Sequence, residues 1–411
     1  MLMNTENKVY DTAVIGAGAS GLAAAVVLAR GGKSVLVLEA GKTAARKILV
    51  SGNGRCNVTN KNMSENCYFG EKDFIKNVLK SFSFKESVEF FKSIGVLLKE
   101  EDDGRYFPVT DKATAVAGAL TLALEENDGV LLTEHKIKEI SRNSVFIVTA
   151  ENGKIFKAKK LMLACGSKAY PQCGGTDSGY TLAQGFGHSV VETAPALSPV
   201  VLEQNPLAKL QGVRIDAEVS VILEKKTLIS SKGEVMFTKN GLNGIPVMNV
   251  SRVLARNPGA KISLNLLPFV NRADFKIYME QRRAEYKNRK IKDFFTGILH
   301  ETIAEQLILL SGIEKTVLAG RMKDDVFCNL ADVLQNWVFA PGRPAKWEDS
   351  YAAAGGVDVK EINPNTLESK KCANVYILGE MLDVDGKSGG FNLHFAFGCG
   401  YKAAKAVLED L

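Results

Sequence analysis

The chain is poor in the patterns that build disulfide frameworks and zinc sites. Its seven cysteines are an odd number, and no two of them form a Cys-x-x-Cys pair. A disulfide scaffold, a zinc site and a dithiol relay are therefore not expected, and we predict no metal site.

Long apolar runs are also missing. The longest apolar helical run, residues 22–29, is too short to span a bilayer. The start of the sequence is polar and has no signal-peptide pattern. We expect a cytoplasmic protein without a membrane partner.

A strong excess of charge is absent as well. The net charge is +6 over 411 residues, which does not by itself imply nucleic acid. The densest basic stretch is residues 281–292 (QRRAEYKNRKIK). We expect it to be the solvated face of a helix, and contact with RNA or an acidic partner is the alternative.

The most informative stretch is residues 11–39, DTAVIGAGASGLAAAVVLARGGKSVLVLE. An apolar strand leads into Gly16, Gly18 and Gly21, and a small-residue helix, a second apolar strand and Glu39 follow. This order is typical of a dinucleotide-binding βαβ unit, whose glycines allow a tight turn and close approach of the backbone to a pyrophosphate. An acid at the end of the second strand accepts hydrogen bonds from ribose hydroxyls and disfavours a 2′-phosphate. The ligand is therefore expected to be FAD or NAD.

The remaining pattern predicts an α/β protein with one nucleotide-binding domain built from both ends of the chain. Turn-rich β segments and polar helices fill the middle. The expected divisions are residues 1–194 for the first part of the FAD-binding domain, 195–340 for an inserted β-barrel or sandwich with a helical cap (helical part about 271–325), and 341–411 for the second part of the FAD-binding domain.

Individual elements are expected as follows. The pattern predicts a loop over 40–60, helices over 72–94, 112–127 and 393–408, antiparallel strands at 129–133, 137–141, 145–149 and 154–157, a separate buried strand at 160–164 and a late strand at 375–378.

A second glycine-rich segment favours FAD over NAD. Gly379 and Glu380 end the late strand, and the loop DVDGKSGGFN leads into the closing helix. Backbone N–H groups near Gly390, Phe391 and Asn392 are expected to face the flavin pyrimidine ring, where the helix dipole favours negative charge.

Five segments carry a family resemblance: KILVSGNGRCNVTN (47–60), CGSKAYPQCGGTDSGYTLAQGFGH (165–188), FTKNGLNGIPVMNVSR (237–252), GGVDVKEINPNTLESK (355–370) and GEMLDVDGKSGGFNLHFAFGCG (379–400). The chain resembles the BaiN/RdsA family of FAD-dependent oxidoreductases, which includes aminoacetone-oxidase-like (YhiN-like) flavoproteins. The resemblance implies a glutathione-reductase-type, Rossmann-like FAD domain with an inserted β-barrel and a helical cap.

The motif and the resemblance together define the expected FAD contacts. They are Gly16, Gly18, Ala19, Ser20, Gly21, Glu39, Ala40, Arg46, Lys47, Ser51, Gly52, Gly54, Arg55, Cys56, Asn57, Ala164, Cys165, Gly166, Gly379, Glu380, Asp383, Gly390, Phe391, Asn392 and Leu393. Arg46, Lys47 and Arg55 are interpreted as cations near the pyrophosphate or the flavin, and solvated loop charges are the alternative. Cys56 and Cys165 are interpreted as small buried residues rather than redox thiols.

Catalytic residues are not assigned by the sequence. His394 is a weak candidate for a proton donor, and a structural role is the competing interpretation. Tyr170 is a second weak candidate, either lining the substrate face or packing.

The sequence favours an FAD-dependent oxidoreductase that binds FAD non-covalently and transfers hydride through flavin N5. The leading hypothesis is NAD(P)H-dependent reduction of an activated C=C bond, such as a bile-acid-like enone, with a small-molecule substrate and no nucleic acid. One alternative is an amine oxidase that uses O2 and releases hydrogen peroxide. A further alternative is a non-catalytic flavin-binding redox sensor or RNA-associated module.

Overall fold

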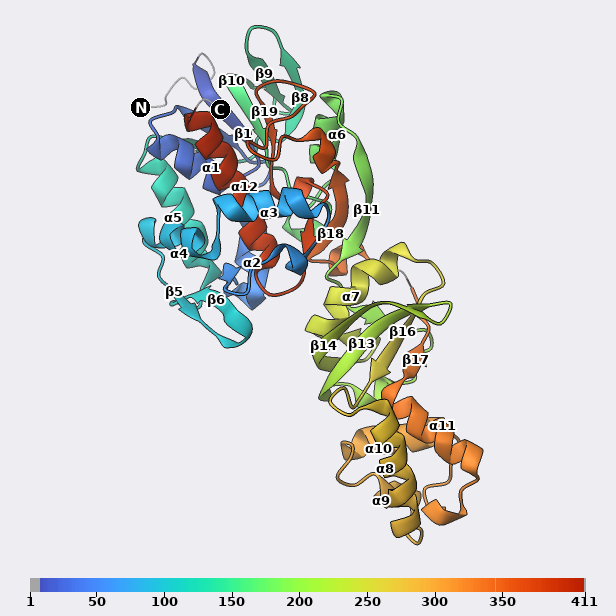
Figure 1. Ribbon diagram of the computed structural model, residues 1–411. Coiled ribbons are helices and arrows are strands. Elements are labelled where there is room, and N and C mark those ends of the chain that lie inside the picture. Colours follow the sequence, from blue (N-terminus) through green and yellow to red (C-terminus); the bar gives the residue numbers. More distant parts are fainter. Residues whose placement is uncertain (1–7, 344, 410–411) are drawn as a thin grey trace. The chain divides into compact units, whose positions relative to one another are not determined.

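The computed structural model describes residues 8–343 and 345–409 (Figure 1). The chain divides into two compact units. The first contains the residues up to Ala194 and those from Tyr351 onward, and the second is Pro195–Ser350. The return to the first unit thus lies at Ser350, whereas the sequence pattern places it at residue 340. Each unit has its own hydrophobic core.

A seven-stranded sheet forms the centre of the first unit, in the order β7-β2-β1-β10-β9-β8 with β19 also paired to β10. The strands are β1 (Val9–Ile15), β2 (Val35–Leu38), β7 (Val130–Leu132), β8 (Ile137–Arg142), β9 (Phe146–Ala150), β10 (Ile155–Leu163) and β19 (Val375–Ile377). β7, β2, β1, β10 and β19 run parallel, and β8 and β9 run antiparallel to their neighbours. The predicted strand 35–38 is confirmed residue for residue.

Two strand predictions are wrong. The segment at 129–133, expected to be antiparallel, forms β7, which pairs parallel with β2. The two strands expected at 154–157 and 160–164 are one continuous strand, β10. Its first half pairs with β9 and its second half with β19, because the late strand continues the sheet where β9 stops.

Helices cover this sheet (Figure 1). They are α1 (Ala19–Arg30), α2 (Arg46–Gly54), α3 (Lys72–Ser81), α4 (Phe84–Ser93), α5 (Ala113–Glu125), α6 (Ser178–Gly185) and α12 (Phe391–Leu408). The small-residue helix α1 packs directly against α12 and α5. A Cβ at Gly400 of α12 would overlap the carbonyl oxygen of Ser20, so only glycine permits this close approach.

The single helix expected over 72–94 is two helices. Phe82 leaves the helical region (φ −138°), and Ser83 caps α4 by accepting a hydrogen bond from the Glu86 N–H at 3.4 Å. The apolar periodicity continues through the break because both helices bury their apolar faces in the same core.

Three small sheets complete the first unit. β3 (Thr59–Asn60), β5 (Leu98–Glu100) and β6 (Arg105–Pro108) form one, β4 (Tyr68–Phe69) pairs with β20 (Asp385–Gly386), and β11 (Val190–Ala196) pairs with β18 (Ala352–Val357).

The second unit contains the barrel that the resemblance implies. Its six strands follow the order β12-β15-β14-β13-β16-β17: β12 (Val200–Val201), β13 (Arg214–Leu223), β14 (Lys226–Thr238), β15 (Gly241–Asn243), β16 (Lys261–Asn265) and β17 (Trp337–Phe339). The two ends of the sheet meet through a bridge between Leu202 and Pro341, supported by a hydrogen bond from the Gly342 N–H to the Val201 carbonyl (2.9 Å). Pairing therefore closes the six strands on themselves.

The helices of the second unit are α7 (Ile245–Arg256), α8 (Arg272–Glu285), α9 (Ile291–Phe294), α10 (Glu301–Leu310) and α11 (Asp324–Gln335). α7 packs on the barrel strands β13 and β14, and α8 to α11 group together as a helical part (Figure 1). Among the helices described here, none is long and apolar enough to cross a membrane.

Candidate functional site

The turn between β1 and α1 has three glycines with different roles. A Cβ at Gly16 would overlap the carbonyl oxygen of Ala164, and one at Gly21 would overlap the carbonyl oxygen of Gly16. A Cβ at Gly18 would meet no atom within 4 Å. Gly18 caps α1 without a side-chain hydrogen bond, so the first-turn N–H groups carry no side-chain partner. The turn therefore offers backbone donors beside open space, as a bound pyrophosphate requires.

Glu39 lies at the end of β2, beside this turn. Its Oε2 accepts a hydrogen bond from the Ala17 N–H at 2.9 Å, and its Oε1 accepts one from the Gly41 N–H at 2.8 Å. The two backbone donors fix the carboxylate next to the glycine turn. A carboxylate held there accepts hydrogen bonds from ribose hydroxyls.

Arg46 approaches the same carboxylate, with its Nη2 3.4 Å from Oε1 of Glu39. Its guanidinium lies against two glycines, and a Cβ at either Gly41 or Gly174 would overlap it. Arg46 thus connects the segment after β2 with the loop before α6. The expectation that Arg46 lies at the nucleotide end of the site stays a prediction, and its location next to Glu39 supports it.

The segment expected to be a loop over 40–60 contains the helix α2. The helix is interrupted, because Ser51, Gly52 and Asn53 have non-helical dihedral angles. Left-handed backbone continues at Gly54 (φ +81°) and Cys56 (φ +64°). Arg55, between them, is right-handed (φ −97°). Glycine adopts left-handed backbone without steric cost, which explains the glycines at 52 and 54.

Lys47 of α2 forms an ion pair with Glu380, which follows β19. Glu380 also accepts a hydrogen bond from the Ala353 N–H at 3.2 Å. The preceding residue, Gly379, has φ +66°, and a Cβ there would lie 2.8 Å from the hydroxyl of Ser20. The start of α1, helix α2 and the end of β19 therefore converge, and they bring together residues that are far apart in the sequence.

Arg55 has carboxylate partners of its own. It pairs with Glu101 and Asp111, and its guanidinium lies 4.3 Å from the ring centroid of Phe107. Hydrogen bonds from Lys99 and then from Arg55 lower the pKa of Asp111. The guanidinium is therefore held by this cluster, which the sequence analysis did not identify. Whether Arg55 contacts a cofactor stays a prediction.

The glycine-rich loop before α12 is fastened by two asparagines. The side chain of Asn392 accepts from the Gly386 N–H and donates to the Gly386 carbonyl, both at 2.8 Å. Asn60 donates to the Gly389 carbonyl at 3.0 Å. Asn392 was expected to offer its backbone N–H, and the structure assigns its side chain to shaping the loop.

The first turn of α12 faces a further unsatisfied group. Gly390 caps the helix with φ +95° and no side-chain hydrogen bond. A Cβ on it would lie 2.7 Å from Oδ1 of Asn57, a buried atom without a hydrogen-bond partner among the described residues. An uncapped helix start beside an unpaired amide oxygen fits a polar ring with donors and acceptors, such as the flavin pyrimidine.

The two thiols in the glycine motifs are inert. Burial raises the pKa of the Cys56 thiol to about 12, and it raises the pKa of Cys165 to about 12 as well. Both side chains are therefore protonated at neutral pH, and a thiol is a poor nucleophile compared with a thiolate. Cys56 is fully buried, as interpreted from the sequence, whereas Cys165 is only partly buried.

His394 is completely buried in α12, and both of its ring nitrogens have partners. Nε2 lies 2.8 Å from the Phe82 carbonyl oxygen, so it carries the proton, and Nδ1 accepts from the Thr59 hydroxyl at 2.8 Å. Burial lowers the pKa of His394 to about 4. Because neither nitrogen is available to a substrate, we propose a structural role for His394.

Tyr170 remains a candidate for the substrate face. It is half-buried, adopts a left-handed conformation (φ +58°) and stacks on the exposed ring of Tyr351, with centroids 5.2 Å apart and planes 18° from parallel. The stacked pair is a flat aromatic surface on the first unit.

Tyr180 was not identified from the sequence. Its side chain is 5% exposed, and its hydroxyl has no hydrogen-bond partner among the described residues. Burial raises the pKa of Tyr180, and the charges of Glu380, Asp177 and Asp383 raise it further. A buried hydroxyl of this kind needs a hydrogen-bond partner that the described residues do not supply. No local pattern distinguishes it from an ordinary helical tyrosine.

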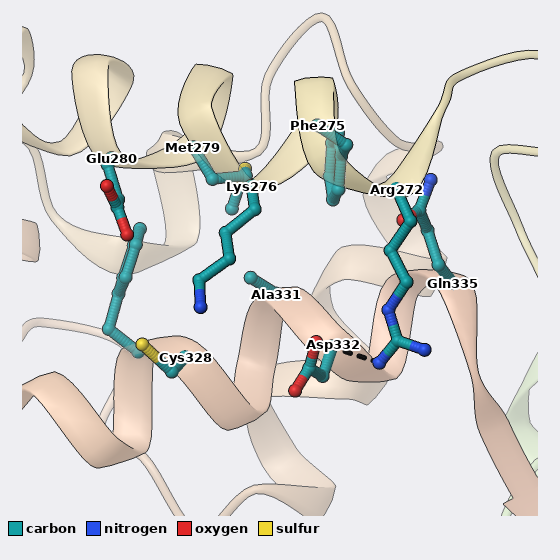
Figure 2. Close-up of a pocket in the computed structure, with 10 residues that line it drawn as sticks. Arg272, Phe275, Lys276, Met279, Glu280, Cys328, Ala331, Asp332 and Gln335 are labelled. Carbon is teal, nitrogen blue, oxygen red and sulfur yellow. Dashed lines mark hydrogen bonds and ion pairs between the residues drawn. The ribbon is translucent and has the colours of Figure 1, made fainter.

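The second unit has a groove between α8 and α11 (Figure 2). Phe275, Met279 and Ala331 line it, and Arg272 pairs with Asp332 across it at 3.2 Å. It contains none of the residues expected at the cofactor.

Comparison with known proteins identifies the chain's relatives. A 3-dehydro-bile acid delta(4,6)-reductase of Clostridium scindens is 34% identical over 403 residues, covering 96% of this chain and 98% of the relative. A ribosomal RNA dihydrouridine synthase of Escherichia coli is 28% identical over 403 residues, covering 98% of both chains. A solved 3-ketosteroid delta1-dehydrogenase from Sterolibacterium denitrificans has the same fold, with a TM-score of 0.53, 14% identity and coverage of 98% of this chain and 100% of that chain.

The family model of the HI0933-like protein Rossmann domain matches residues 10–406, nearly the whole chain. This match confirms the resemblance drawn from the five sequence segments. The chain belongs to the HI0933-like family of FAD-dependent oxidoreductases, the group to which the BaiN/RdsA proteins belong.

Proposed function

We propose that the protein is an FAD-dependent reductase of a carbon–carbon double bond conjugated to a carbonyl group. The observation that carries the proposal is the chemistry shared by the two named relatives. A 3-oxo bile acid with 4,6-unsaturation and the uracil ring of uridine both contain a C=C bond next to a carbonyl. Hydride adds to the carbon remote from the carbonyl, and a proton adds to the neighbouring carbon. The alignments span nearly the full length of each protein, so the shared reaction class is a reasonable expectation for this chain.

The residues present fit the cofactor. Gly18 leaves open space at the start of α1, Glu39 is fixed beside it, and the first turn of α12 is uncapped. These groups would hold the pyrophosphate, the adenosine ribose and the flavin ring respectively. Bound FAD supplies a two-electron hydride donor at N5.

The ion pair between Lys47 and Glu380 holds α2 against the end of β19. In this arrangement Glu380 keeps one carboxylate oxygen on the backbone of Ala353, so its orientation is set before a ligand binds. The pair also fixes the Lys47 ammonium in place, and a preorganised cation stabilises negative charge that develops nearby without further rearrangement.

We further propose that FAD binds non-covalently and that NAD(P)H donates the electrons. The protonated thiols of Cys56 and Cys165 and the fully partnered ring of His394 leave these side chains unsuited to a covalent link. The sequence has one complete dinucleotide fingerprint, so NAD(P)H would act as a transient reactant rather than a resident one. The balance is two electrons and one proton from NAD(P)H and a second proton from solvent.

The test is an anaerobic spectral titration of the purified protein. NADH or NADPH should bleach the flavin absorption, and a 3-oxo-4-ene steroid acid or a uridine-containing RNA should restore it. Flavin that stays oxidised with NAD(P)H but is reduced by a small amine, with peroxide released in air, would overturn the proposal in favour of the oxidase alternative.

A further inference from the structure

The positive charge of the chain is concentrated in the second unit. Residues 195–350 contain 22 lysines and arginines and 17 aspartates and glutamates, a net charge of +5 out of the total of +6. The first unit, which holds the candidate cofactor site, is therefore nearly neutral. A charge confined to an inserted domain indicates a surface with its own electrostatic role.

Within the second unit, two segments place cations side by side. Residues 287–292 and 315–321 run antiparallel, joined by a bridge between Lys290 and Leu318 and by a hydrogen bond from the Ala319 N–H to the Arg289 carbonyl at 2.9 Å. We call the exposed cations on and next to these segments the basic surface. They are Lys287, Arg289, Lys290, Lys292, Lys315, Arg321 and Lys323.

Most of these cations have no carboxylate partner. Lys315 pairs with Glu305 at 3.1 Å, and Lys292 lies 3.8 Å from Asp293. Among the described residues, no carboxylate lies within ion-pair distance of the other five: Lys287, Arg289, Lys290, Arg321 and Lys323. Five unpaired cations on two joined segments repel one another, and a polyanion would relieve that repulsion.

The neighbouring arginines differ in this respect. Arg282 donates to the carbonyls of Phe294 and Thr296, both at 2.8 Å, and Arg283 pairs with Asp324 at 2.7 Å. These two side chains stabilise the helical part, so they are not available to a partner. Within the basic run of residues 281–292, only the cations from Lys287 onward therefore belong to the basic surface.

The chemistry of the surface favours RNA over a membrane. Between the cations, Ile291 is fully buried and Val317 packs on the core, so no apolar ridge is presented to a bilayer. The guanidinium of Arg289 lies 3.8 Å from the ring centroid of Tyr286. A planar cation held in this way can stack on an unpaired base, which is how single-stranded RNA is often recognised.

We propose that the basic surface binds the phosphate backbone of single-stranded RNA. This inference concerns a surface of the second unit and does not depend on the proposed reductase activity. It develops the alternative interpretation of residues 281–292 and assigns it to particular side chains.

The test is fluorescence anisotropy of labelled oligouridylate RNA titrated with the full-length holoprotein at several KCl concentrations. If the five unpaired cations contact phosphates, the slope of log affinity against log salt should be about −3.5, since each contact on a single strand contributes about −0.7. No measurable RNA binding at low salt would overturn the proposal.

Matched variants distinguish the effect of the basic surface on RNA binding from the effect of the protein's net charge. The variant Lys287→Glu, Arg289→Glu, Lys290→Glu should lose at least about tenfold in affinity, and the steepness of its salt slope should decrease by about 2. The control variant Lys138→Glu, Lys154→Glu, Lys157→Glu changes three exposed cations of the first unit by the same charge and should retain the steep slope. Equal losses in both variants would contradict the assignment.

Two further binding measurements, with duplex DNA and with lipid vesicles, test the class of partner. Tighter binding to duplex DNA, or to vesicles of phosphatidylcholine and phosphatidylglycerol, than to RNA would overturn the RNA assignment. Flavin absorption and circular dichroism check that each variant is folded. If the charge reversal prevents folding, the milder Lys287→Gln, Arg289→Gln, Lys290→Gln variant should show the same reduction in salt slope.

Discussion

The first prediction separates two glycines of the turn between β1 and α1. Gly18→Ala should leave the fold intact and weaken FAD binding, whereas Gly21→Ala should destabilise the protein even without cofactor. At position 18 the dihedral angles (φ −85°, ψ −167°) are accessible to alanine, and the new Cβ would meet no atom within 4 Å.

The magnitudes follow from these contacts. Alanine is a poorer helix cap than glycine, but replacing glycine at a compatible conformation gains about 0.4–1 kcal/mol by restricting the unfolded chain, so the net change at Gly18 should stay within about 1 kcal/mol. A Cβ at Gly21 would overlap the Gly16 carbonyl oxygen, and forced overpacking of this kind costs about 1–3 kcal/mol or more.

For FAD affinity, in contrast, Gly18→Ala should be the more damaging of the two substitutions. A methyl group at Gly18 would occupy the space needed by the pyrophosphate and remove at least one hydrogen bond to a charged group, worth about 1.5–3 kcal/mol. FAD affinity should therefore fall by about tenfold to a hundredfold.

The assay is urea denaturation of the apoprotein together with titration of FAD by flavin fluorescence. Gly18→Ala with wild-type FAD affinity would refute the location of the pyrophosphate. Equal destabilisation of the apoprotein by both substitutions would refute the assignment of different roles to the two glycines.

Three further predictions concern the rest of the site. The pKa of His394 is lowered from 6.5 to about 4, so the neutral ring contributes stability at pH 6.5 and above. The free energy of unfolding should therefore fall by about 1.4 kcal/mol per pH unit between pH 6.5 and 4. Urea midpoints measured against pH should lack this pH-dependent fall in His394→Asn. Lys47→Met should weaken FAD binding because Glu380 loses its cation, whereas Lys61→Met, which removes an exposed ion pair with Glu100, should not; equal FAD affinities in the two variants would contradict this. Acid precipitation should release all of the flavin from both the wild type and Cys165→Ser, and retained yellow colour in the pellet would refute non-covalent binding.

The sequence predicted best the elements whose signals are local. Glycine spacing and uninterrupted apolar runs identify the turn at Gly16 and the strand Val35–Leu38 without knowledge of their partners. The missed break between α3 and α4 also had a local signal. Ser83 and Glu86 have the Ser-x-x-Glu spacing of a capping box, and Ser83 accepts from the Glu86 N–H, so this local signal outweighs the apolar period that continues across Phe82.

Strand direction had no such signal. β7 is only three residues long, and its parallel pairing with β2 is set by the crossover through α5 rather than by its own sequence. The closure of the barrel likewise depends on Leu202 meeting Pro341, two residues that no spacing rule relates.

The same limit applies to charged side chains, and it decides how the basic stretch of residues 281–292 should be interpreted. Arg282 finds its carbonyl partners at Phe294 and Thr296, and Arg283 finds its carboxylate at Asp324, all further along the chain. Lys287 and Arg289 lie in the same stretch, but no carboxylate of the described residues lies within ion-pair distance of them. Composition treats all four cations alike, and only tertiary contacts divide them into those that stabilise the helical part and those left for a partner. The four cations should therefore be neutralised one at a time and each variant measured in two assays. Loss of Arg282 or Arg283 should lower the unfolding midpoint. Loss of Lys287 or Arg289 should reduce the salt dependence of RNA binding.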